Sequence, residues 1–326
     1  MIGIGMLGAS RIGVGAVIEP AAGIAVVELV AVAARSNARA EDYAAVHGIP
    51  IVEPDYQALV SSPDVDLVYV GLPPSEHKEW TIAALRAGKH VLCEKPFALN
   101  AGEAAEMVSV AEASGTRLIE AFHYRFHPLF ARVIEIVKAG EIGEVERVDG
   151  HFNVPISYEP SEIRYSKHLG GGALMDLGCY PVHWARSVVD GRADVVAASA
   201  DWHQSGVDVA MSAELRFPNG VAGFVRCSMH EQLREGLDAK LTVTGRQGVL
   251  SVDNPLAPHL GHKLTVDIDG ESVSETRDGE TTYHYQLAHV VDVIENEAEQ
   301  LTGSTDSVET MQLLDQMYRA AAQTKT

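Results

Sequence analysis

Three side chains of this 326-residue sequence have the types and spacing that proton and hydride chemistry requires: Lys95, Asp176 and Tyr180. Asp176 and Tyr180 are four residues apart in a predicted helix, so both are expected on one face, with His183 one turn further. Oxidation of an alcohol carbon needs a base for the hydroxyl proton as hydride leaves, and the reverse reaction needs an acid. A phenol, with an ordinary pKa of about 10, can serve when a nearby ammonium favours the phenolate. Lys95 is the candidate for that ammonium, and its charge would also polarise a substrate oxygen.

Lys95 follows a predicted strand at His90–Cys93, within the sequence Cys93-Glu94-Lys95-Pro96. Open α/β sheets bind their ligands at the carboxyl ends of the strands, so Lys95 is expected at a binding edge. Pro96 keeps the preceding residue out of the helical region, which helps to fix the direction of the Lys95 side chain.

A glycine-rich turn from Gly8 to Gly13 follows the predicted first strand, Ile2–Leu7. A dinucleotide site needs a tight turn, a backbone bare enough to approach the pyrophosphate, and a helix N-terminus directed at it. Gly8 would supply the turn and Gly13 the close packing of helix on sheet, while Ser10 replaces the usual middle glycine. The predicted cofactor-binding residues of this turn and of the later strand ends are Gly8, Ser10, Arg11, Ile12, Leu72, Pro73, His77, Glu94 and Lys95. For His77, a local hydrogen bond in the first turn of a helix is an equally good interpretation.

The residues after the second predicted strand, Val26–Ala34, decide between the two nicotinamide cofactors. A carboxylate there binds the ribose hydroxyls of NAD, whereas an arginine accommodates the 2′-phosphate of NADP. The sequence continues with Arg35 and Ser36, and Arg39 lies one helical turn further. Because a guanidinium suits a phosphate, NADP is the predicted cofactor and NAD is left open. The alternative for Arg35 is an ordinary surface charge.

The pattern of apolar runs predicts an α/β Rossmann domain followed by an α+β domain with an open, mainly antiparallel sheet. Up to about residue 121, short apolar runs alternate with helical stretches, as in βαβ units on a parallel sheet. Between about 195 and 273, short strands follow one another across turns. We therefore predict an NADP-binding domain at 1–121 and a substrate-binding and oligomerisation domain at 122–326. Because helices would cover only one face of the open sheet, its other face is expected to be apolar and to form a homodimer or higher homo-oligomer.

Together with the glycine turn, four further segments resemble the Gfo/Idh/MocA oxidoreductase family: Leu72–His77, Cys93–Pro96, Glu120–Pro128 and Gly170–Pro181. The resemblance covers essentially the whole chain, and the Asp-x-x-x-Tyr form is similar to the dihydrodiol and xylose dehydrogenase branch. It implies proton transfer by Tyr180, with Lys95 as its electrostatic partner and Asp176 as a substrate-positioning or pKa-tuning group. It also suggests a cis bond between Lys95 and Pro96. Many family members carry histidine at the position of Tyr180, and His183 is a reserve base.

Other residues are candidates for a substrate cleft. Arg125 and His127 belong to the Glu120–Pro128 segment, which could instead hold the domain junction, and His123 stands where close relatives have an apolar residue. Arg164 lies in the polar loop before the triple glycine, a region expected to set specificity. The predicted substrate residues are Arg125, His127, Arg164, Asp176 and His183. The alternatives are a core position for Tyr180 and a structural ion pair with Arg186 for Asp176.

Composition excludes several classes of partner. With 45 acidic and 25 basic side chains, the net charge of −20 repels nucleic acid and anionic lipid, so neither is an expected partner. Three scattered cysteines, Cys93, Cys179 and Cys227, predict neither disulfides nor a zinc ribbon. Asp176, Cys179 and His183 have helical spacing but lack further ligands, so no metal is expected. Without a basic leader or a long apolar stretch, a cytoplasmic enzyme is the expectation.

These observations predict an NADP-dependent oxidoreductase that transfers a hydride between nicotinamide and the CH–OH or carbonyl carbon of a sugar, polyol or dihydrodiol. Two alternatives remain. A redox-assisted glycosidase on a related fold would favour NAD, against which Arg35 counts. A non-catalytic NADP-binding sensor or repressor would have no need of Lys95, Asp176 and Tyr180 together. The exact substrate and the physiological direction cannot be read from the sequence.

Overall fold

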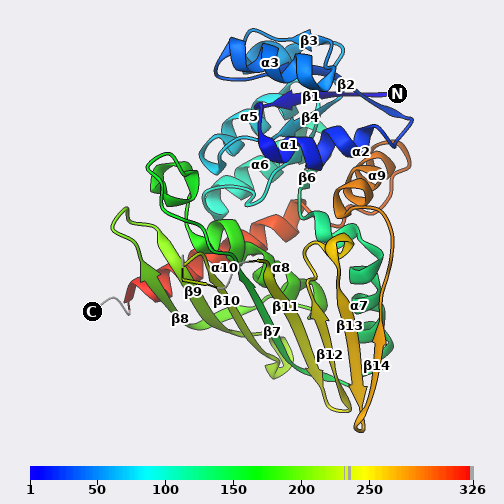
Figure 1. Cartoon of the computed structure of the whole chain (residues 1–326), viewed down its shortest axis with the longest axis vertical. Helices are drawn as coiled ribbons and strands as arrows, with labels where there is room; N and C mark the ends of the chain where they lie inside the picture. The colour runs from blue at the N-terminus through cyan, green and yellow to red at the C-terminus, as the bar shows by residue number, and fades with distance from the viewer. Residues whose placement is uncertain (231, 234–235, 324–326) are drawn as a thin grey trace. The chain divides into compact units, whose positions relative to one another are not determined.

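Six parallel strands form the first sheet of the computed structural model, which describes residues 1–230, 232–233 and 236–323 (Figure 1). Their order is β3-β2-β1-β4-β5-β6, so the chain winds outward from β1 in both directions. The carboxyl ends of β1 and β4 flank the point where the order reverses, which is where Rossmann folds bind dinucleotides. The strands are β1 (Ile2–Leu7), β2 (Val27–Ala33), β3 (Ile51–Val52), β4 (Leu67–Val70), β5 (His90–Cys93) and β6 (Leu118–Glu120).

The helices of this region begin and end at residues that suit helix termini. Asn100 caps one of them, since its Oδ1 accepts the N–H of Glu103 at 3.0 Å. Gly48 and Gly115 end two others in the left-handed conformation. The helices are α1 (Arg11–Gly13), a π-helical turn (Val14–Ile18), α2 (Glu19–Ala21), α3 (Asn37–His47), α4 (Tyr56–Ser61), α5 (Pro74–Arg86), α6 (Ala101–Ser114) and, late in the chain, α9 (Thr282–Glu295).

Contacts divide the chain into two compact units. The first comprises Met1–Arg125 together with Thr281–Val308, and the second comprises Phe126–Glu280 and the chain from Glu309 onward. The predicted single boundary at 121/122 had placed Thr281–Val308 with the second domain. In the structure this segment joins the first unit because Leu287 and Val290 of α9 are buried in the same hydrophobic cluster as the β1 strand. The division into a cofactor domain and a substrate domain stays a prediction.

The second unit contains an eight-stranded sheet of order β14-β13-β12-β11-β7-β10-β9-β8. Its pairs are antiparallel except for β7 and β10, which are parallel, so the predicted mainly antiparallel sheet is confirmed. The strands are β7 (Val145–Asn153), β8 (Asp194–Trp202), β9 (Asp208–Arg216), β10 (Ala222–Ser228), β11 (Asp238–Gly245), β12 (Gly248–Asp253), β13 (Lys263–Ile268) and β14 (Glu271–Glu275).

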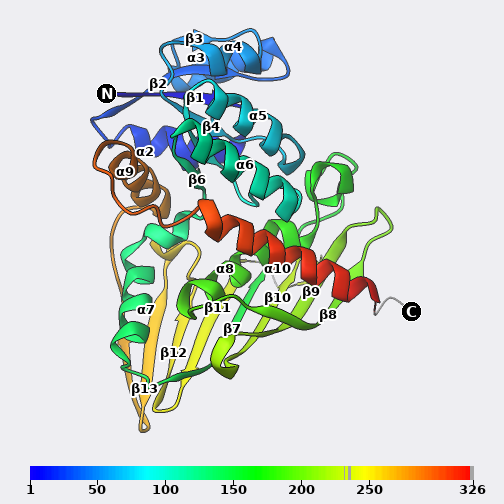
Figure 2. The same ribbon diagram turned by 180° about the vertical axis from the view of Figure 1, so that it is seen from behind.

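Figures 1 and 2 show α7, α8 and α10 on one face of this sheet. Their apolar residues, among them Phe130 and Trp184, are buried. Their bounds are α7 (Pro128–Ala139), α8 (Cys179–Val188), preceded by a π-helical turn (Leu174–Gly178), and α10 (Ser304–Gln323). Within the described residues, no helix has the length and apolar character that a membrane span would need.

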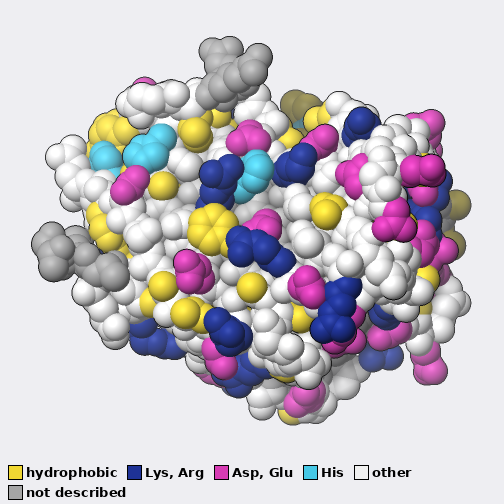
Figure 3. Space-filling model, turned by 90° about the horizontal axis from the view of Figure 1, so that it is seen from below, with side chains coloured by type: hydrophobic (Ala, Val, Ile, Leu, Met, Phe, Trp, Pro, Cys, Tyr) yellow, Lys and Arg dark blue, Asp and Glu magenta, His cyan; other side chains and the backbone are white. Residues whose placement is uncertain are grey.

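The opposite face of the sheet is polar, which corrects the expectation of an apolar face. Side chains that alternate away from the buried core include Arg147, Asp149, Ser212 and Thr242, all exposed or half-buried. Arg147 forms an ion pair with Asp149 along its own strand at 2.6 Å. The face of the molecule seen in Figure 3 likewise intersperses basic, acidic and hydrophobic side chains. Association of two copies through the sheet stays a prediction, and the contacts would combine these polar side chains with apolar ones such as Phe224, which pairs with Asp149 on the same face.

Candidate active site

The turn after β1 has the backbone that a dinucleotide site requires. Gly8 has φ +94°, and a Cβ there would lie 3.0 Å from the carbonyl oxygen of Gly71. Ser10 caps the helix that follows, since its Oγ accepts the N–H of Gly13 at 3.2 Å. A Cβ on Gly13 would lie 2.8 Å from Cε of Met6 in β1, which confirms that this glycine permits close packing of helix on sheet. Arg11 and Ile12 between them are exposed.

Two side chains of α3 hold this turn from outside. Nη2 of Arg39 donates to the carbonyl oxygen of Ala9 at 2.8 Å, and the hydroxyl of Tyr43 donates to that of Ser10 at 3.0 Å. Burial raises the pKa of Tyr43 to about 12, so this phenol stays a donor. The sequence analysis missed Tyr43, because its only signal is a place one turn beyond Arg39 in α3.

Arg35 lies two residues past the end of β2 and is exposed. Ser36 caps α3, its Oγ accepting the N–H of Arg39 at 3.4 Å. Burial raises the pKa of Tyr56 in α4, and the charges of Arg35 and Arg39 counteract that rise, which places all three side chains near one another. The carboxyl end of β2 therefore carries two guanidinium groups, as the 2′-phosphate of NADP would require.

His77 links the carboxyl ends of β4 and β5. Its ring is fully buried, with Nε2 2.8 Å from the carbonyl oxygen of Leu72 and Nδ1 3.0 Å from that of Pro96. Burial lowers the pKa of His77. The contact with Leu72 is the local hydrogen bond of the alternative interpretation, and the contact with Pro96 ties the Leu72–Pro73 turn to the Lys95–Pro96 bond, which is cis as the resemblance suggested. Contact of His77 with a cofactor stays a prediction.

Glu94 lies under the loop that carries Lys95. Its Oε1 accepts the buried hydroxyl of Tyr69 in β4 at 2.9 Å, and Oε2 lies 3.3 Å from the backbone nitrogen of Lys95. Burial and the charge of Glu94 raise the pKa of Tyr69 well above its ordinary value. Tyr69, which the sequence analysis read only as a strand residue, thus supports the backbone from which the half-buried Lys95 projects.

In the second unit, Asp176 and Tyr180 lie on one continuous helical segment, Asp176 in the π-helical turn and Tyr180 in the first turn of α8. Asp176 forms an ion pair with Arg164, whose Nε lies 2.5 Å from its Oδ2. Nη1 of Arg164 contacts Glu162 at 3.0 Å. The structure thus brings together two of the predicted substrate residues, Arg164 and Asp176. Asp176 pairs with Arg164, whereas Arg186 contacts Glu309 and Thr310.

Tyr180 is only 4% exposed and packs edge-on against Phe152 of β7, and its ring also lies near that of Trp184. His183 is 1% exposed within the same helix. The helix that carries the candidate base is therefore held firmly in the core, which limits the movement of the phenol.

The glycine run before this helix packs against two neighbours. A Cβ on Gly171 would lie 2.5 Å from the carbonyl oxygen of Arg164, and one on Gly172 would lie 2.2 Å from Oδ1 of Asp208. Asp208 is the first residue of β9, and the sequence indicates no role for it beyond the start of a strand.

The histidines of the Glu120–Pro128 segment contact neighbouring parts of the protein. His127 caps α7, its Nδ1 accepting the N–H of Leu129 at 3.1 Å. His123 lies 2.7 Å from the hydroxyl of Thr282 and stacks on Tyr283. Arg125 ends the first unit and is half-buried. Substrate contacts of Arg125 and His127 stay predictions. Among the described residues, no cluster of histidine, cysteine or acidic side chains is arranged to hold a metal ion.

Comparison with known proteins covers both units. Residues 1–122 match the oxidoreductase family with an NAD-binding Rossmann fold, and residues 130–251 match the Gfo/Idh/MocA C-terminal domain. The D-xylose 1-dehydrogenase (NADP(+)) 2 of Haloferax volcanii is 35% identical over 97% of this chain and 96% of its own length. The trans-1,2-dihydrobenzene-1,2-diol dehydrogenase of Sus scrofa is 33% identical over 70% of this chain and 67% of its own.

Solved structures agree with this. KijD10, a 3-ketoreductase from Actinomadura kijaniata seen with NADP and TDP-benzene, superposes with a TM-score of 0.89 at 27% identity, covering 98% of this chain and 97% of its own. The aldose-aldose oxidoreductase of Caulobacter crescentus, complexed with glycerol, gives a TM-score of 0.90 at 25% identity, covering 99% and 98%. The glycine turn, the parallel sheet and the similarity along nearly the whole chain converge: the chain belongs to the Gfo/Idh/MocA family of nicotinamide-dependent oxidoreductases.

Proposed function

We propose that this chain is an NADP-dependent dehydrogenase that transfers a hydride between the nicotinamide and a CH–OH or carbonyl carbon of a sugar, polyol or cyclic diol. The observation that carries the proposal is that Asp176 and Tyr180 share one rigid helical segment, in a chain that also has Lys95 after β5. A fold that only bound the cofactor would not need these three groups. The relatives named above, which act on xylose and on a dihydrodiol, support the substrate class.

NADP fits the first unit. The bare backbone at Gly8 and the helix N-terminus after it would hold the pyrophosphate. Arg35 and Arg39 at the end of β2 would bind the 2′-phosphate, since a guanidinium matches phosphate geometry. The residues Ala34-Arg35-Ser36-Asn37 offer no carboxylate for the ribose hydroxyls of NAD. The similar xylose dehydrogenase carries NADP(+) in its name, and KijD10 was solved with NADP.

In the proposed reaction, the bound nicotinamide supplies the hydride acceptor. Tyr180 takes the proton of the substrate hydroxyl as the hydride leaves the same carbon, and returns it in the reverse direction. Lys95 supplies a positive charge that favours the phenolate and polarises the substrate oxygen. Asp176, oriented by Arg164, positions a neighbouring hydroxyl of the substrate.

The test is a turnover assay with NADP+ and with NAD+ across aldoses, polyols, inositols and trans-dihydrodiols, followed by the absorbance of the reduced nicotinamide. We expect turnover with one substrate class, faster with NADP+. Tyr180→Phe should lower kcat by about 10²–10⁴-fold, the contribution of general acid–base catalysis, with the Kd for NADP+ unchanged.

His183→Asn is the matched variant, because it removes the reserve base from the same helix. A loss of turnover in His183→Asn but not in Tyr180→Phe would reassign the base. If the protein binds NADP+ tightly and no substrate of the panel is oxidised, the dehydrogenase proposal fails in favour of a binding role.

A further inference from the structure

A buried carboxylate lies beneath the helical segment that carries Asp176 and Tyr180. Asp208, the first residue of β9, is fully buried, and its Oδ2 accepts the N–H of Leu174 at 2.7 Å. Leu174 is the first residue of the π-helical turn that leads into α8. The first N–H groups of a helix have no acceptor within the helix, so Asp208 caps this one from a different element.

The second oxygen of the same carboxylate reaches a third element. Oδ1 accepts the hydroxyl of Tyr318 in α10 at 2.8 Å. Asp208 therefore joins the sheet to the helical segment and to α10. Because both oxygens are used, rotation of the carboxylate would break at least one contact, and its position is closely defined.

The backbone has been shaped around this carboxylate. Gly172 has φ +127°, and a Cβ there would lie 2.2 Å from Oδ1 of Asp208 and 3.0 Å from the hydroxyl of Tyr318. Any other residue would displace the acid or the loop. Gly172, the third glycine of the run, lies two residues before the π-helical turn. The close approach of Asp208 explains why a glycine is needed there.

The charge of Asp208 is costly. Burial raises its pKa to about 6, against the lowering effect of its hydrogen bonds to Leu174 and Tyr318. The titratable groups near it include the phenol of Tyr318 and the thiol of Cys227, and burial raises the pKa of each, with Asp208 raising both further. Cys179, which also acts on both, opens α8. Because the folded-state pKa lies above the unfolded one, ionisation of Asp208 opposes folding above about pH 6 and ceases to do so below about pH 4. A group that costs stability at neutral pH is typically kept for function.

We propose that Asp208 is a positioning residue of the active site, fixing the N-terminal turn of the helical segment and with it the placement of Asp176 and Tyr180. The inference rests on the proposed function, since the placement of those side chains matters only if they act on a substrate. Because Asp208 is fully buried, it would act through the backbone N–H of Leu174.

The test compares wild type with Asp208→Asn, Tyr318→Phe and, as a control on the same strand, Ser212→Ala, which faces the opposite side of the sheet. Asp208→Asn should lower kcat by about 10–100-fold, the cost of misplacing catalytic groups by about an ångström, with the KM for NADP+ unchanged. Wild type should lose kcat on the acid side near pH 6, and this limb should be missing in Asp208→Asn. Ser212→Ala should match wild type.

Tyr318→Phe keeps the charge and removes one hydrogen bond to it, so it guards against a failure of Asp208→Asn to fold. We expect a smaller loss of kcat, and an acid limb shifted to higher pH, because the ionised carboxylate has lost a donor. Wild-type kcat and an unchanged pH profile in Tyr318→Phe, or in a folded Asp208→Asn, would overturn the proposal. Lack of turnover in the wild type would instead overturn the proposed function, and this inference with it.

Discussion

Arg164 donates its Nε–H to Oδ2 of Asp176 at 2.5 Å, which couples the loop before the glycine run to the helix of the candidate base. The side chain of Asp176 is 20% exposed and that of Arg164 is 35% exposed, so the pair is partly screened from water. Burial alone would lower the pKa of Arg164, but the carboxylates of Asp176 and Glu162 raise it above its ordinary value. Asp176 is therefore half of an ion pair rather than a bare charge, and a substrate that it positions would meet it in that form.

Replacement of Arg164 by glutamine should uncouple the loop from the helix. We expect kcat to fall by about 10–100-fold, because Asp176 loses both its orientation and its counter-charge. The KM for NADP+ should not change, since the dinucleotide turn belongs to the first unit. Steady-state kinetics would measure both. Glu162→Gln is the control: it leaves the Arg164–Asp176 contact in place, and a loss of kcat as large as that of Arg164→Gln would contradict the assignment.

The two arginines after β2 should differ in their effects on cofactor choice. Arg35 has an exposed side chain, so Arg35→Ala should raise the KM for NADP+ by about 10–100-fold and leave that for NAD+ unchanged. Arg39 also holds the carbonyl oxygen of Ala9, so Arg39→Ala should weaken both cofactors. Initial rates with each cofactor would separate the two effects. Equal loss of both cofactors in Arg35→Ala would leave that residue without a role in selecting NADP.

His127 should make the fold sensitive to acid. Burial lowers its pKa to about 4, with smaller contributions from His262 and His259. The unfolded chain takes up a proton near the ordinary value of 6.5, so the free energy of unfolding should fall as the pH drops from about 6.5 to 4. The loss attributable to this residue is on the order of 2–3 kcal/mol, from the size of the pKa shift.

His127→Asn tests this, because asparagine can cap α7 without titrating. Urea unfolding at pH 7.5 and pH 5 should show a smaller pH dependence in the variant than in wild type. An identical pH dependence of the two proteins would show that His127 protonates freely in the folded state.

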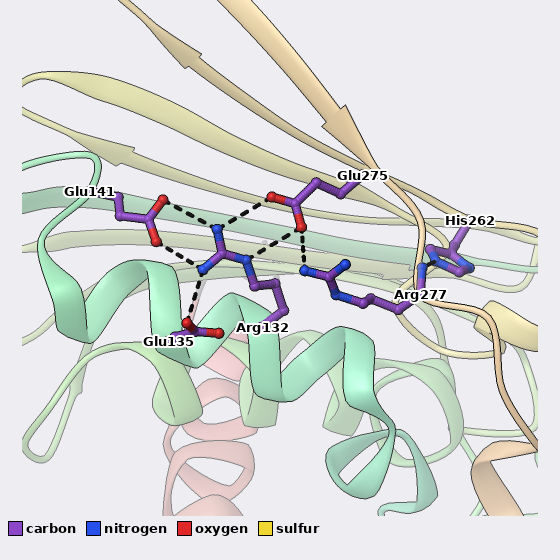
Figure 4. A network of polar contacts seen from close by, with 6 residues as sticks. All are labelled: Arg132, Glu135, Glu141, His262, Glu275 and Arg277. Atoms are coloured by element: carbon purple, nitrogen blue, oxygen red, sulfur yellow. Dashed lines mark hydrogen bonds and ion pairs between the residues drawn. The ribbon is translucent and has the colours of Figure 1, made fainter.

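A network of charges joins α7 to the edge strand β14 (Figure 4). Arg132 contacts Glu141 at 2.8 Å, Glu275 at 3.3 Å and Glu135 at 3.4 Å, and Glu275 also pairs with Arg277. Hydrogen bonds to Glu141 and Glu275 raise the pKa of Arg132. With its side chain 16% exposed, Arg132 is partly shielded from solvent, and its removal would leave several carboxylates facing one another.

Arg132→Ala should therefore lower the free energy of unfolding by about 2–3 kcal/mol, and Arg132→Lys should recover only part of this, because an ammonium lacks the planar fork. Arg246→Ala is a suitable control. Arg246 also pairs with two carboxylates, Glu144 and Glu146, but its side chain is 64% exposed, so we expect a loss below about 1 kcal/mol. Equal losses in Arg132→Ala and Arg246→Ala would refute the argument from burial.

Much of the first unit could be predicted, because its signals are local. β1 and β5 have the predicted bounds, and Gly13 packs where the dinucleotide pattern requires. The two-residue strand β3 and the short helix α4 were missed, since they are too brief to show a period. The π-helical turns at Val14–Ile18 and Leu174–Gly178 were also missed, because no propensity distinguishes them from α-helix.

Contacts between distant residues were beyond the reach of sequence patterns. Nothing in the spacing of Arg164 and Asp176 indicates an ion pair, and Asp208 is 34 residues from the N–H that it accepts. The largely polar outer face of the second sheet contradicted an expectation that rested on the architecture of an open sheet with helices on one face, and not on the side chains of its strands. Contacts between side chains of different elements depend on how those elements pack in three dimensions, and the pattern of a single sequence does not reveal that packing.

Because Thr281–Val308 belongs to the first unit, that unit includes a segment that is synthesised after the second sheet. Leu287, Val290, Val291 and Val293 complete a hydrophobic cluster whose other buried residues all precede Phe122. On the ribosome, the dinucleotide unit must therefore wait with part of its core uncovered until the whole intervening sheet has been translated. The hydrophobic core of the first unit can be completed only after the second sheet has been synthesised.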